Sequence, residues 1–175
     1  MQNTLKYPVA LIGFMGVGKS TIGKRLAKEL QVDFIDTDMQ VEQRVNKTIS
    51  EIFADSGEDY FRELEHAVID EIFLDAPRVV AIGGGAYCFE KNRKIIESVA
   101  TSILLQAAPE TIFERLKVDQ TRPLLMHENK IAEIRNLLTL REASYQLARY
   151  CFRTDDGTAF DELVMKIKQT ILGNQ

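Results

Sequence analysis

The sequence predicts an α/β fold in which helices cover both faces of a parallel sheet. Short apolar runs rich in β-branched residues alternate with longer segments of helical period, which is the pattern of such a fold. The chain has 175 residues, of which 45% are hydrophobic, enough for one sizeable core and too few residues for two full domains. We therefore expect residues 1–175 to form a single domain.

The charge of the chain and its cysteine content indicate which binding partners and which cellular compartment to expect. The 26 acidic residues outnumber the 22 basic ones, for a net charge of −4, which gives no reason to expect a nucleic acid or an anionic membrane as partner. The two cysteines, Cys88 and Cys151, form no C-x-x-C motif and suit a reducing compartment. No window approaches the roughly 18 apolar residues that span a bilayer, and the N-terminal apolar run lacks a cleavage site. We expect a cytoplasmic protein.

The expected strands are short apolar runs, and the expected helices follow from spacing and capping signals. Thr48 and Glu51 form a capping box, and Gly57 is expected to stop the short helix that they begin. Pro109 suits the first turn of another helix. The predicted strands are 9–12, 32–35, 79–82, 101–105 and, more weakly, 150–153; the other predicted helices are 22–30, 58–73, 109–116, 130–149 and 159–172.

Residues 118–130 fit neither the helical nor the strand period. Pro123 stands in the middle of this segment, and charged residues are mixed with three apolar ones. Such a segment is typical of a mobile functional loop. We expect a lid at about residues 117–130.

The stretch GFMGVGKST at residues 13–21 matches the phosphate-binding pattern G-x-x-x-x-G-K-[ST]. An expected strand precedes it and an expected helix follows, which is the context that this motif requires. Its glycines let consecutive backbone N–H groups point into one concavity at a helix N-terminus, where a phosphate fits. Lys19 would lie against the β- and γ-phosphates, and Ser20 would bind Mg²⁺. The alternative, a glycine-rich turn without a ligand, is disfavoured by this context.

The chain lacks the N-K-x-D and D-x-x-G motifs of GTP-binding switches, and it is small for a motor or a transport ATPase. A small-molecule kinase remains. After the second expected strand, Asp36 and Asp38 alternate with Thr37, so both can point in the same direction at the carboxyl end of the sheet. One can serve Mg²⁺ and the other can accept a hydrogen bond from a substrate hydroxyl. The alternative is a helix-capping acid with a solvated neighbour.

Further candidates for substrate binding follow along the chain. The glycine cluster 83–85 directly follows the strand 79–82 and predicts close approach of a ligand to the main chain. Two of the arginines at this edge would form a bidentate anchor for a carboxylate. Arg122, in the lid, would suit charge that develops on the transferred phosphoryl group. The anchoring candidates are Arg62 and Arg141.

The strings GFMGVGKST, DTD, FRELE, GGG, RPLL and LREASY occur in this order, and residues 8 to 150 resemble the shikimate kinase family. The resemblance implies a P-loop NTPase fold of the nucleoside-monophosphate-kinase-like type, a three-layer sandwich whose five-stranded parallel sheet has the order 2-3-1-4-5. It also implies transfer of the γ-phosphate of ATP to the 3-hydroxyl of shikimate, a step in aromatic amino acid biosynthesis. The implied cofactor is Mg²⁺, and the implied partners are ATP and shikimate. We expect a monomer.

The resemblance also implies roles for particular residues. Asp38 would hold the reacting hydroxyl, either as its base or only to orient it. Glu65 would support Arg62, and Arg115 would lie near adenine. The metal residues would be Ser20 and Asp36. The implied catalytic residues are Lys19, Asp38 and Arg122; the implied substrate-binding residues are Asp38, Arg62, Gly84, Gly85 and Arg141; and the implied ATP-binding residues are Gly16, Val17, Gly18, Lys19, Ser20, Thr21, Arg115 and Arg122.

The chain departs from the family pattern after residue 150, where CFRTDDGTAFDE replaces a V-V-D-T-like strand and turn. Two alternatives therefore remain. A gluconate-type or nucleoside monophosphate kinase could share the scaffold, although RPLL together with LREASY argues against it. A catalytically silent nucleotide-binding module is the other, although Lys19, Asp38 and the anchoring arginines are all present.

Overall fold

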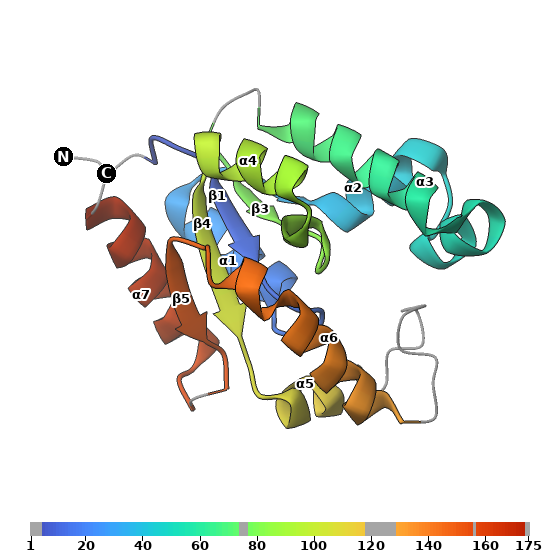
Figure 1. The fold of residues 1–175 in the computed structure, drawn as a ribbon. Helices are drawn as coiled ribbons and strands as arrows, with labels where there is room; N and C mark the ends of the chain where they lie inside the picture. The colour runs from blue at the N-terminus through green and yellow to red at the C-terminus, as the bar shows by residue number, and fades with distance from the viewer. Residues whose placement is uncertain (1–4, 74–76, 118–128, 156, 174–175) are drawn as a thin grey trace.

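The computed structural model describes residues 5–73, 77–117, 129–155 and 157–173 (Figure 1). Five strands form one sheet in the order β2-β3-β1-β4-β5, and every neighbouring pair is parallel. This order confirms the topology that the resemblance implied. The strands are β1 (Val9–Ile12), β2 (Phe34–Asp36), β3 (Val79–Ala81), β4 (Thr101–Gln106) and β5 (Tyr150–Arg153).

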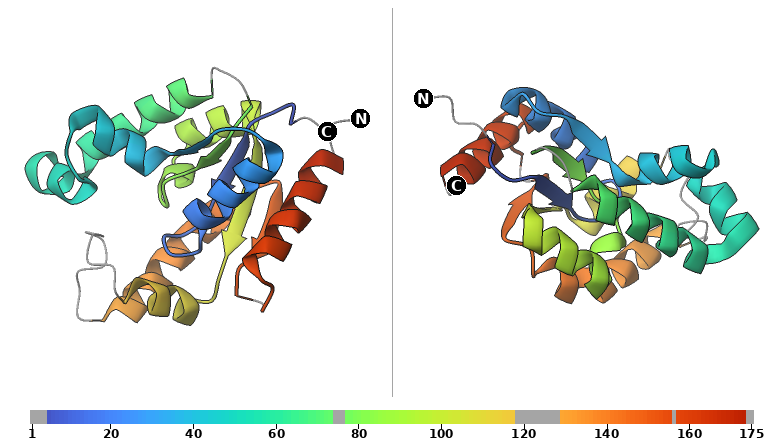
Figure 2. Two further views of the ribbon diagram at one scale, coloured as in Figure 1. Left: turned by 180° about the vertical axis from the view of Figure 1, so that it is seen from behind. Right: turned by 90° about the horizontal axis from the view of Figure 1, so that it is seen from above.

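Helices cover both faces of the sheet. Helices α1 and α7 pack together on one face, and α3 and α4 pack together on the other (Figure 2). None of the helices in the described ranges is both long and apolar enough to cross a bilayer. The helices are α1 (Lys19–Leu30), α2 (Thr37–Val45), α3 (Ile49–Ile72), the 3₁₀ helix η1 (Ala86–Cys88), α4 (Glu90–Val99), α5 (Pro109–Leu116), α6 (Lys130–Tyr145) and α7 (Phe160–Gly173).

The central strand β1 separates two hydrophobic cores. Val9 and Leu11 face the core with α1 and α7, while Ala10 and Ile12 face the core with α3 and α4. Successive side chains of a strand point to opposite faces. Because both faces are covered, the strand is apolar at every position rather than at alternate ones.

The strand before the two aspartates is shorter and lies later than expected, and this corrects the alternation inferred for Asp36 and Asp38. Strand β2 ends at Asp36, and α2 begins at Thr37. The Asp36 side chain caps this helix, since its Oδ1 accepts from the backbone N–H of Asp38 across 3.1 Å. A helix N-terminus leaves such N–H groups without partners, and aspartate satisfies them well. Asp38 therefore projects from the first turn of a helix rather than from a strand.

The predicted helix starts and ends can be compared with those in the structure. The capping box of Thr48 and Glu51 is confirmed, and Gly57 interrupts α3 with φ 80° and ψ 176°. Helix α6 ends at Tyr145, before the expected end at residue 149, because Leu147 and Ala148 donate to carbonyls of a turn that leads into β5. The predicted lid and its Arg122 lie outside the described residues, apart from residues 117, 129 and 130.

Candidate active site

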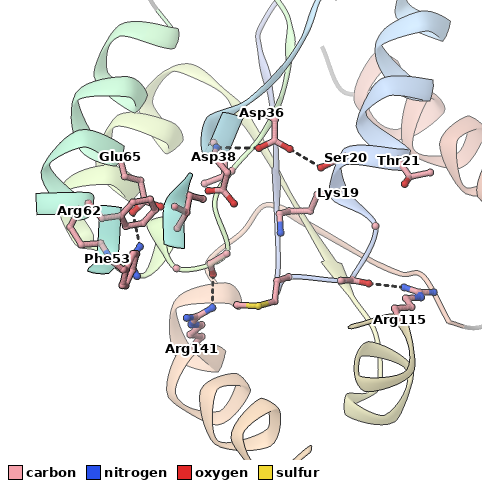
Figure 3. Close-up of a pocket in the computed structure, with 18 of the residues that line it drawn as sticks. Lys19, Ser20, Thr21, Asp36, Asp38, Phe53, Arg62, Glu65, Arg115 and Arg141 are labelled. Atoms are coloured by element: carbon pink, nitrogen blue, oxygen red, sulfur yellow. Dashed lines mark hydrogen bonds and ion pairs between the residues drawn. The ribbon is translucent and has the colours of Figure 1, made fainter. Parts of the chain in front are cut away.

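A cleft of about 330 Å³ opens where β1, β2 and β3 end (Figure 3). The carboxyl ends of parallel strands meet at one edge of a sheet, which is where α/β proteins bind ligands. The phosphate loop and the first turn of α1 line one end of the cleft, which we call the nucleotide end. Residues of α2, α3, α6 and the glycine cluster line the other, which we call the acceptor end. The cleft therefore joins segments that are far apart in the sequence.

The phosphate loop has the backbone conformation that its glycines permit. Gly13, Gly16 and Gly18 have φ of 140°, 78° and 103°, a region that other residues rarely adopt. A Cβ on Gly13 would also lie 2.3 Å from the carbonyl oxygen of Leu105. The loop thus needs glycine for its curvature and for its contact with β4.

Lys19 lies within the curve of the loop. Its Nζ donates to the carbonyl oxygens of Gly13 across 2.8 Å and of Phe14 across 3.1 Å. These contacts hold the ammonium group at the concavity formed by the loop, beside Ser20 and Thr21, which also line the cleft. A phosphate bound in the loop would meet this positive charge directly.

Ser20 and Asp36 form a pair of oxygen ligands next to the loop. The Ser20 hydroxyl donates to Oδ2 of Asp36 across 2.7 Å. No cluster of three histidine, cysteine, aspartate or glutamate side chains suited to a metal occurs within the described ranges. Mg²⁺ prefers oxygen ligands and is usually bound by one or two carboxylates together with waters and substrate phosphates. The Ser20 and Asp36 pair therefore fits Mg²⁺.

At the acceptor end, Arg62 is held by two acidic residues of its own helix. It pairs with Oε2 of Glu65 across 2.9 Å and with Oε1 of Glu58 across 2.9 Å. Its guanidinium also lies over the rings of Phe61 and Phe89, at 5.0 and 5.1 Å from their centroids. Ion pairs and aromatic faces together fix the orientation of this arginine. The expected support of Arg62 by Glu65 is present in the structure.

Glu65 is the most deeply buried acid of the cleft, with 1% of its side chain exposed. Burial raises the pKa of Glu65 to about 7, because the charged form loses hydration, and the positive charge of Arg62 opposes this rise. The negative charge of Asp38 raises the pKa of Glu65 further, and Arg141 lowers it. Glu65 is thus coupled to both arginines and to the aspartate of the acceptor end.

Side chains of the protein itself leave little room for a Cβ atom in the glycine cluster. A Cβ on Gly83 would lie 2.6 Å from Oε1 of Glu65 and 2.7 Å from Oδ1 of Asp38, and a Cβ on Gly85 would lie 3.1 Å from Arg62. The sequence alone had suggested that a ligand approaches the main chain here, whereas the structure places side chains of the protein next to Gly83 and Gly85. Within the described part of the chain, no hydrogen bond is donated by the backbone N–H of Gly84 or Gly85, and both glycines line the cleft. These two N–H groups are therefore suited to a substrate.

Arg141 reaches the cleft from α6. Its side chain donates to the carbonyl oxygen of Gly84 across 3.0 Å and lies 5.2 Å from the ring centroid of Phe14. The hydroxyl of Tyr145, one turn further along α6, donates to the same carbonyl. Sequence reasoning missed Tyr145, although the spacing of four residues after Arg141 places both on one helix face.

Arg115 connects α5 to the phosphate loop. It donates to the Thr154 carbonyl across 2.8 Å and to the Gly16 carbonyl across 3.3 Å. Phe160 lies beside it, with 5.8 Å between the guanidinium carbon of Arg115 and the ring centroid, and it lines the cleft next to Gly18. Sequence reasoning missed Phe160, and no motif marks it.

The structure brings most of the expected site residues to one cleft. The exceptions are Val17, whose side chain is buried in the core beside the loop, and Arg122, which lies outside the described residues. Phe53 and Phe61 also line the cleft, with their ring centroids 5.0 Å apart. The residues brought together are Gly16, Gly18, Lys19, Ser20, Thr21, Asp36, Asp38, Arg62, Gly84, Gly85, Arg115 and Arg141.

Comparisons with known proteins agree with the resemblance seen in the sequence. The family model for shikimate kinase matches residues 15–172. A shikimate kinase from Cereibacter sphaeroides is 35% identical over 167 residues, covering 95% of this chain and 83% of that protein. One from Thermodesulfovibrio yellowstonii is 40% identical over 159 residues, covering 91% of each.

Solved structures point to the same family. Shikimate kinase from Acinetobacter baumannii in complex with shikimate superimposes with a TM-score of 0.93 at 36% identity, covering 97% of this chain and 95% of that one. A gluconokinase from Sinorhizobium meliloti shares only 14% identity at a TM-score of 0.62, which shows the fold alone. The chain therefore belongs to the shikimate kinase family.

Proposed function

We propose that this protein transfers the γ-phosphate of ATP to the 3-hydroxyl of shikimate, giving shikimate 3-phosphate and ADP. One observation carries the proposal: a single cleft holds a phosphate loop at one end and two arginines at the other, with Asp38 between them (Figure 3). Phosphoryl transfer depends mainly on positioning and on stabilisation of charge. This arrangement supplies both.

At the nucleotide end, the loop amides and Lys19 bind the phosphates of ATP. The Lys19 ammonium exchanges its contacts with the Gly13 and Phe14 carbonyls for phosphate oxygens, which carry full charge and bind it more strongly. Ser20 and Asp36 would hold Mg²⁺, which would neutralise charge on the phosphates. The 2.7 Å contact between these two residues supports this assignment.

At the acceptor end, Arg62 and Arg141 bind the carboxylate of shikimate. Both guanidinium groups line the cleft, and Glu65, Glu58 and the Gly84 carbonyl hold them in place. A planar guanidinium suits bidentate binding of a carboxylate.

Asp38 accepts a hydrogen bond from the reacting hydroxyl and takes its proton. Its position in the first turn of α2 places its carboxylate between Lys19 and Glu65 (Figure 3). The backbone N–H groups of Gly84 and Gly85 would bind further oxygens of the substrate.

Two further roles belong to the proposal. Arg115 and Phe160 form the side of the cleft next to Gly18, and the adenine would pack between this pair and the loop, since flat aromatic faces suit a base. Arg122, which lies outside the described residues, would approach the transferred phosphoryl group from the lid. A monomer that acts in the cytoplasm, without a nucleic-acid or membrane partner, stays a prediction; sedimentation of the purified protein tests the oligomeric state.

The direct test is a coupled assay of ADP release by the purified protein with ATP and Mg²⁺. We expect turnover with shikimate and none with gluconate or a nucleoside monophosphate. Turnover with gluconate but not with shikimate would overturn the substrate assignment. ATP binding without transfer to any of these acceptors would instead identify a silent nucleotide-binding module.

A further inference from the structure

Several backbone carbonyls of the turn that follows the glycine cluster accept hydrogen bonds that hold the turn in place. Within it, Gly83 accepts from the N–H of Ala86 across 3.0 Å and Gly85 accepts from the N–H of Cys88 across 3.1 Å. The Gly84 carbonyl is taken by Arg141 of α6. Of the carbonyls of η1, that of Ala86 accepts from the N–H of Phe89 across 3.2 Å. The Tyr87 and Cys88 carbonyls lie at the end of this short helix, where backbone donors run out.

Arg93 supplies donors to the last two of these carbonyls. Its Nη1 donates to the carbonyl oxygen of Tyr87 across 3.1 Å and to that of Cys88 across 3.3 Å. The guanidinium also lies 5.9 Å from the ring centroid of Tyr87, a fully buried side chain. Arg93 is half-buried on α4 and is not among the residues that line the cleft. Its hydrogen bonds therefore hold η1 from outside the cleft.

Asn92, the preceding residue of α4, binds the first carbonyl of η1. Its Nδ2 donates to the Ala86 carbonyl across 3.1 Å, and its Oδ1 lies 2.6 Å from Nδ1 of His66. The Asn92 side chain is 1% exposed. His66 stands one residue after Glu65 on α3, which packs against α4 (Figure 1). Asn92 thus ties η1 to the helix that presents Arg62 to the cleft.

We propose that Arg93 and Asn92 are positioning residues for the acceptor substrate. They hold η1, and with it the Gly84 and Gly85 N–H groups, at a set distance from Arg62. The close approach of Arg62 to Gly85, where a Cβ would lie 3.1 Å from the guanidinium, makes this distance sensitive to small shifts of the turn. The inference rests on the proposed function, since it assumes that shikimate binds at the acceptor end.

The test compares Arg93→Met with Lys94→Met in steady-state kinetics. Both variants replace a cation of α4 by methionine, but Lys94 is exposed and pairs with Glu90 on the same helix. We expect Arg93→Met to raise the KM for shikimate about three- to tenfold, the size of one ordinary hydrogen bond. The KM for ATP and kcat should stay within about twofold of the Lys94→Met values, since the nucleotide end is not touched. Arg93→Lys, which restores a donor, should recover part of the loss.

A second variant removes the buried donor without changing its shape. Asn92→Asp loses the Nδ2 donor to Ala86 and places a carboxylate against that carbonyl, so we expect a rise in the shikimate KM at least as large as for Arg93→Met. The inference is overturned if Arg93→Met matches Lys94→Met, or if the KM values of both substrates change together. A wild-type protein that does not phosphorylate shikimate at all would instead refute the proposed function.

Discussion

At the nucleotide end of the cleft, nine consecutive residues, 13–21, supply the phosphate loop, the ammonium group of Lys19 and the hydroxyl of Ser20. At the acceptor end, the functional groups come from α2, α3, the glycine cluster and α6, which are spread over residues 38 to 145. The first end offers a ligand mainly backbone groups, whose conformation glycine permits. The second offers charged side chains that hold one another in place.

This difference has a consequence for how each end responds to mutation. A backbone loop depends on local conformation, so a change in one of its side chains should affect only what that side chain contacts. The acceptor end is a coupled network, in which Glu65 interacts with Arg62, Asp38 and Arg141, and changes in such networks are not additive. We therefore expect the effects of nucleotide-end variants to stay confined to ATP. Acceptor-end variants should affect shikimate and one another.

Asp38→Asn should have the largest effect, because Asp38 lies where the two ends meet. We expect kcat to fall by about 10²- to 10⁴-fold, the usual range for the loss of a general base. Both KM values should change little, since asparagine keeps the shape of the side chain. Steady-state assays that vary each substrate in turn would check this result. A near-normal kcat would remove Asp38 from the role of base.

Lys19→Met tests the nucleotide end alone. The loss of a charge-stabilising group at the transferred phosphoryl should lower kcat/KM for ATP by about 10²- to 10³-fold. Shikimate binding, measured by calorimetry without nucleotide, should be unchanged. If shikimate affinity fell by a similar factor, the two ends would not be separate in the way that the structure indicates.

Arg141→Ala tests the acceptor end. We expect shikimate binding to weaken by about 1.5 to 3 kcal/mol, as for a lost hydrogen bond to a charged group, which is one to two decades in KM. Arg135→Ala is the matched control, because Arg135 lies on the same helix but pairs with Glu110 at the surface. Impaired ATP binding with an unchanged shikimate KM would assign Arg141 to the other end.

Glu65→Gln tests the raised pKa of Glu65 at the acceptor end through the pH dependence of the free energy of unfolding. The pKa of Glu65 is raised from 4.5 to about 7 by burial, so the folded state holds this proton more tightly than the unfolded state does. The resulting stabilisation is full below pH 4.5 and is lost as the pH rises through 7. Between pH 5 and 7, the wild type should lose about 2 kcal/mol of unfolding free energy relative to Glu65→Gln.

Urea unfolding of both proteins at the two pH values would measure this difference. Equal losses in the wild type and the variant would show that Glu65 does not hold its proton in the folded protein. Gln is the suitable replacement because it keeps the size of the protonated acid.

Several features were predictable because they depend on residues that lie close together in the sequence. The phosphate loop follows from Gly13, Gly16 and Gly18 before Lys19, and the capping box from Thr48 and Glu51. An arginine by itself is usually a solvated surface residue. Arg62 and Arg141 could therefore be named only as anchoring candidates, and the role of Arg115 came only from the resemblance.

Other features could not be read from local pattern. Asp36 and Asp38 both line the cleft, as predicted, but strand alternation is the wrong reason. Asp36 caps α2, as the alternative interpretation held, and Asp38 lies in the first turn of that helix. Gly83 must be glycine because carboxylates from two other elements approach it. Phe160 reaches the cleft because α7 packs beside α1.

The amino-acid sequence by itself therefore determined the conformation of the loop, the kinds of element and the chemistry available at each position. The tertiary structure alone decided which charges become partners, how deeply Glu65 is buried, and which glycines face side chains rather than ligand. The reason is physical: a backbone conformation depends on neighbouring residues, whereas an ion pair or a buried charge depends on the distance between elements that the chain brings together from far apart.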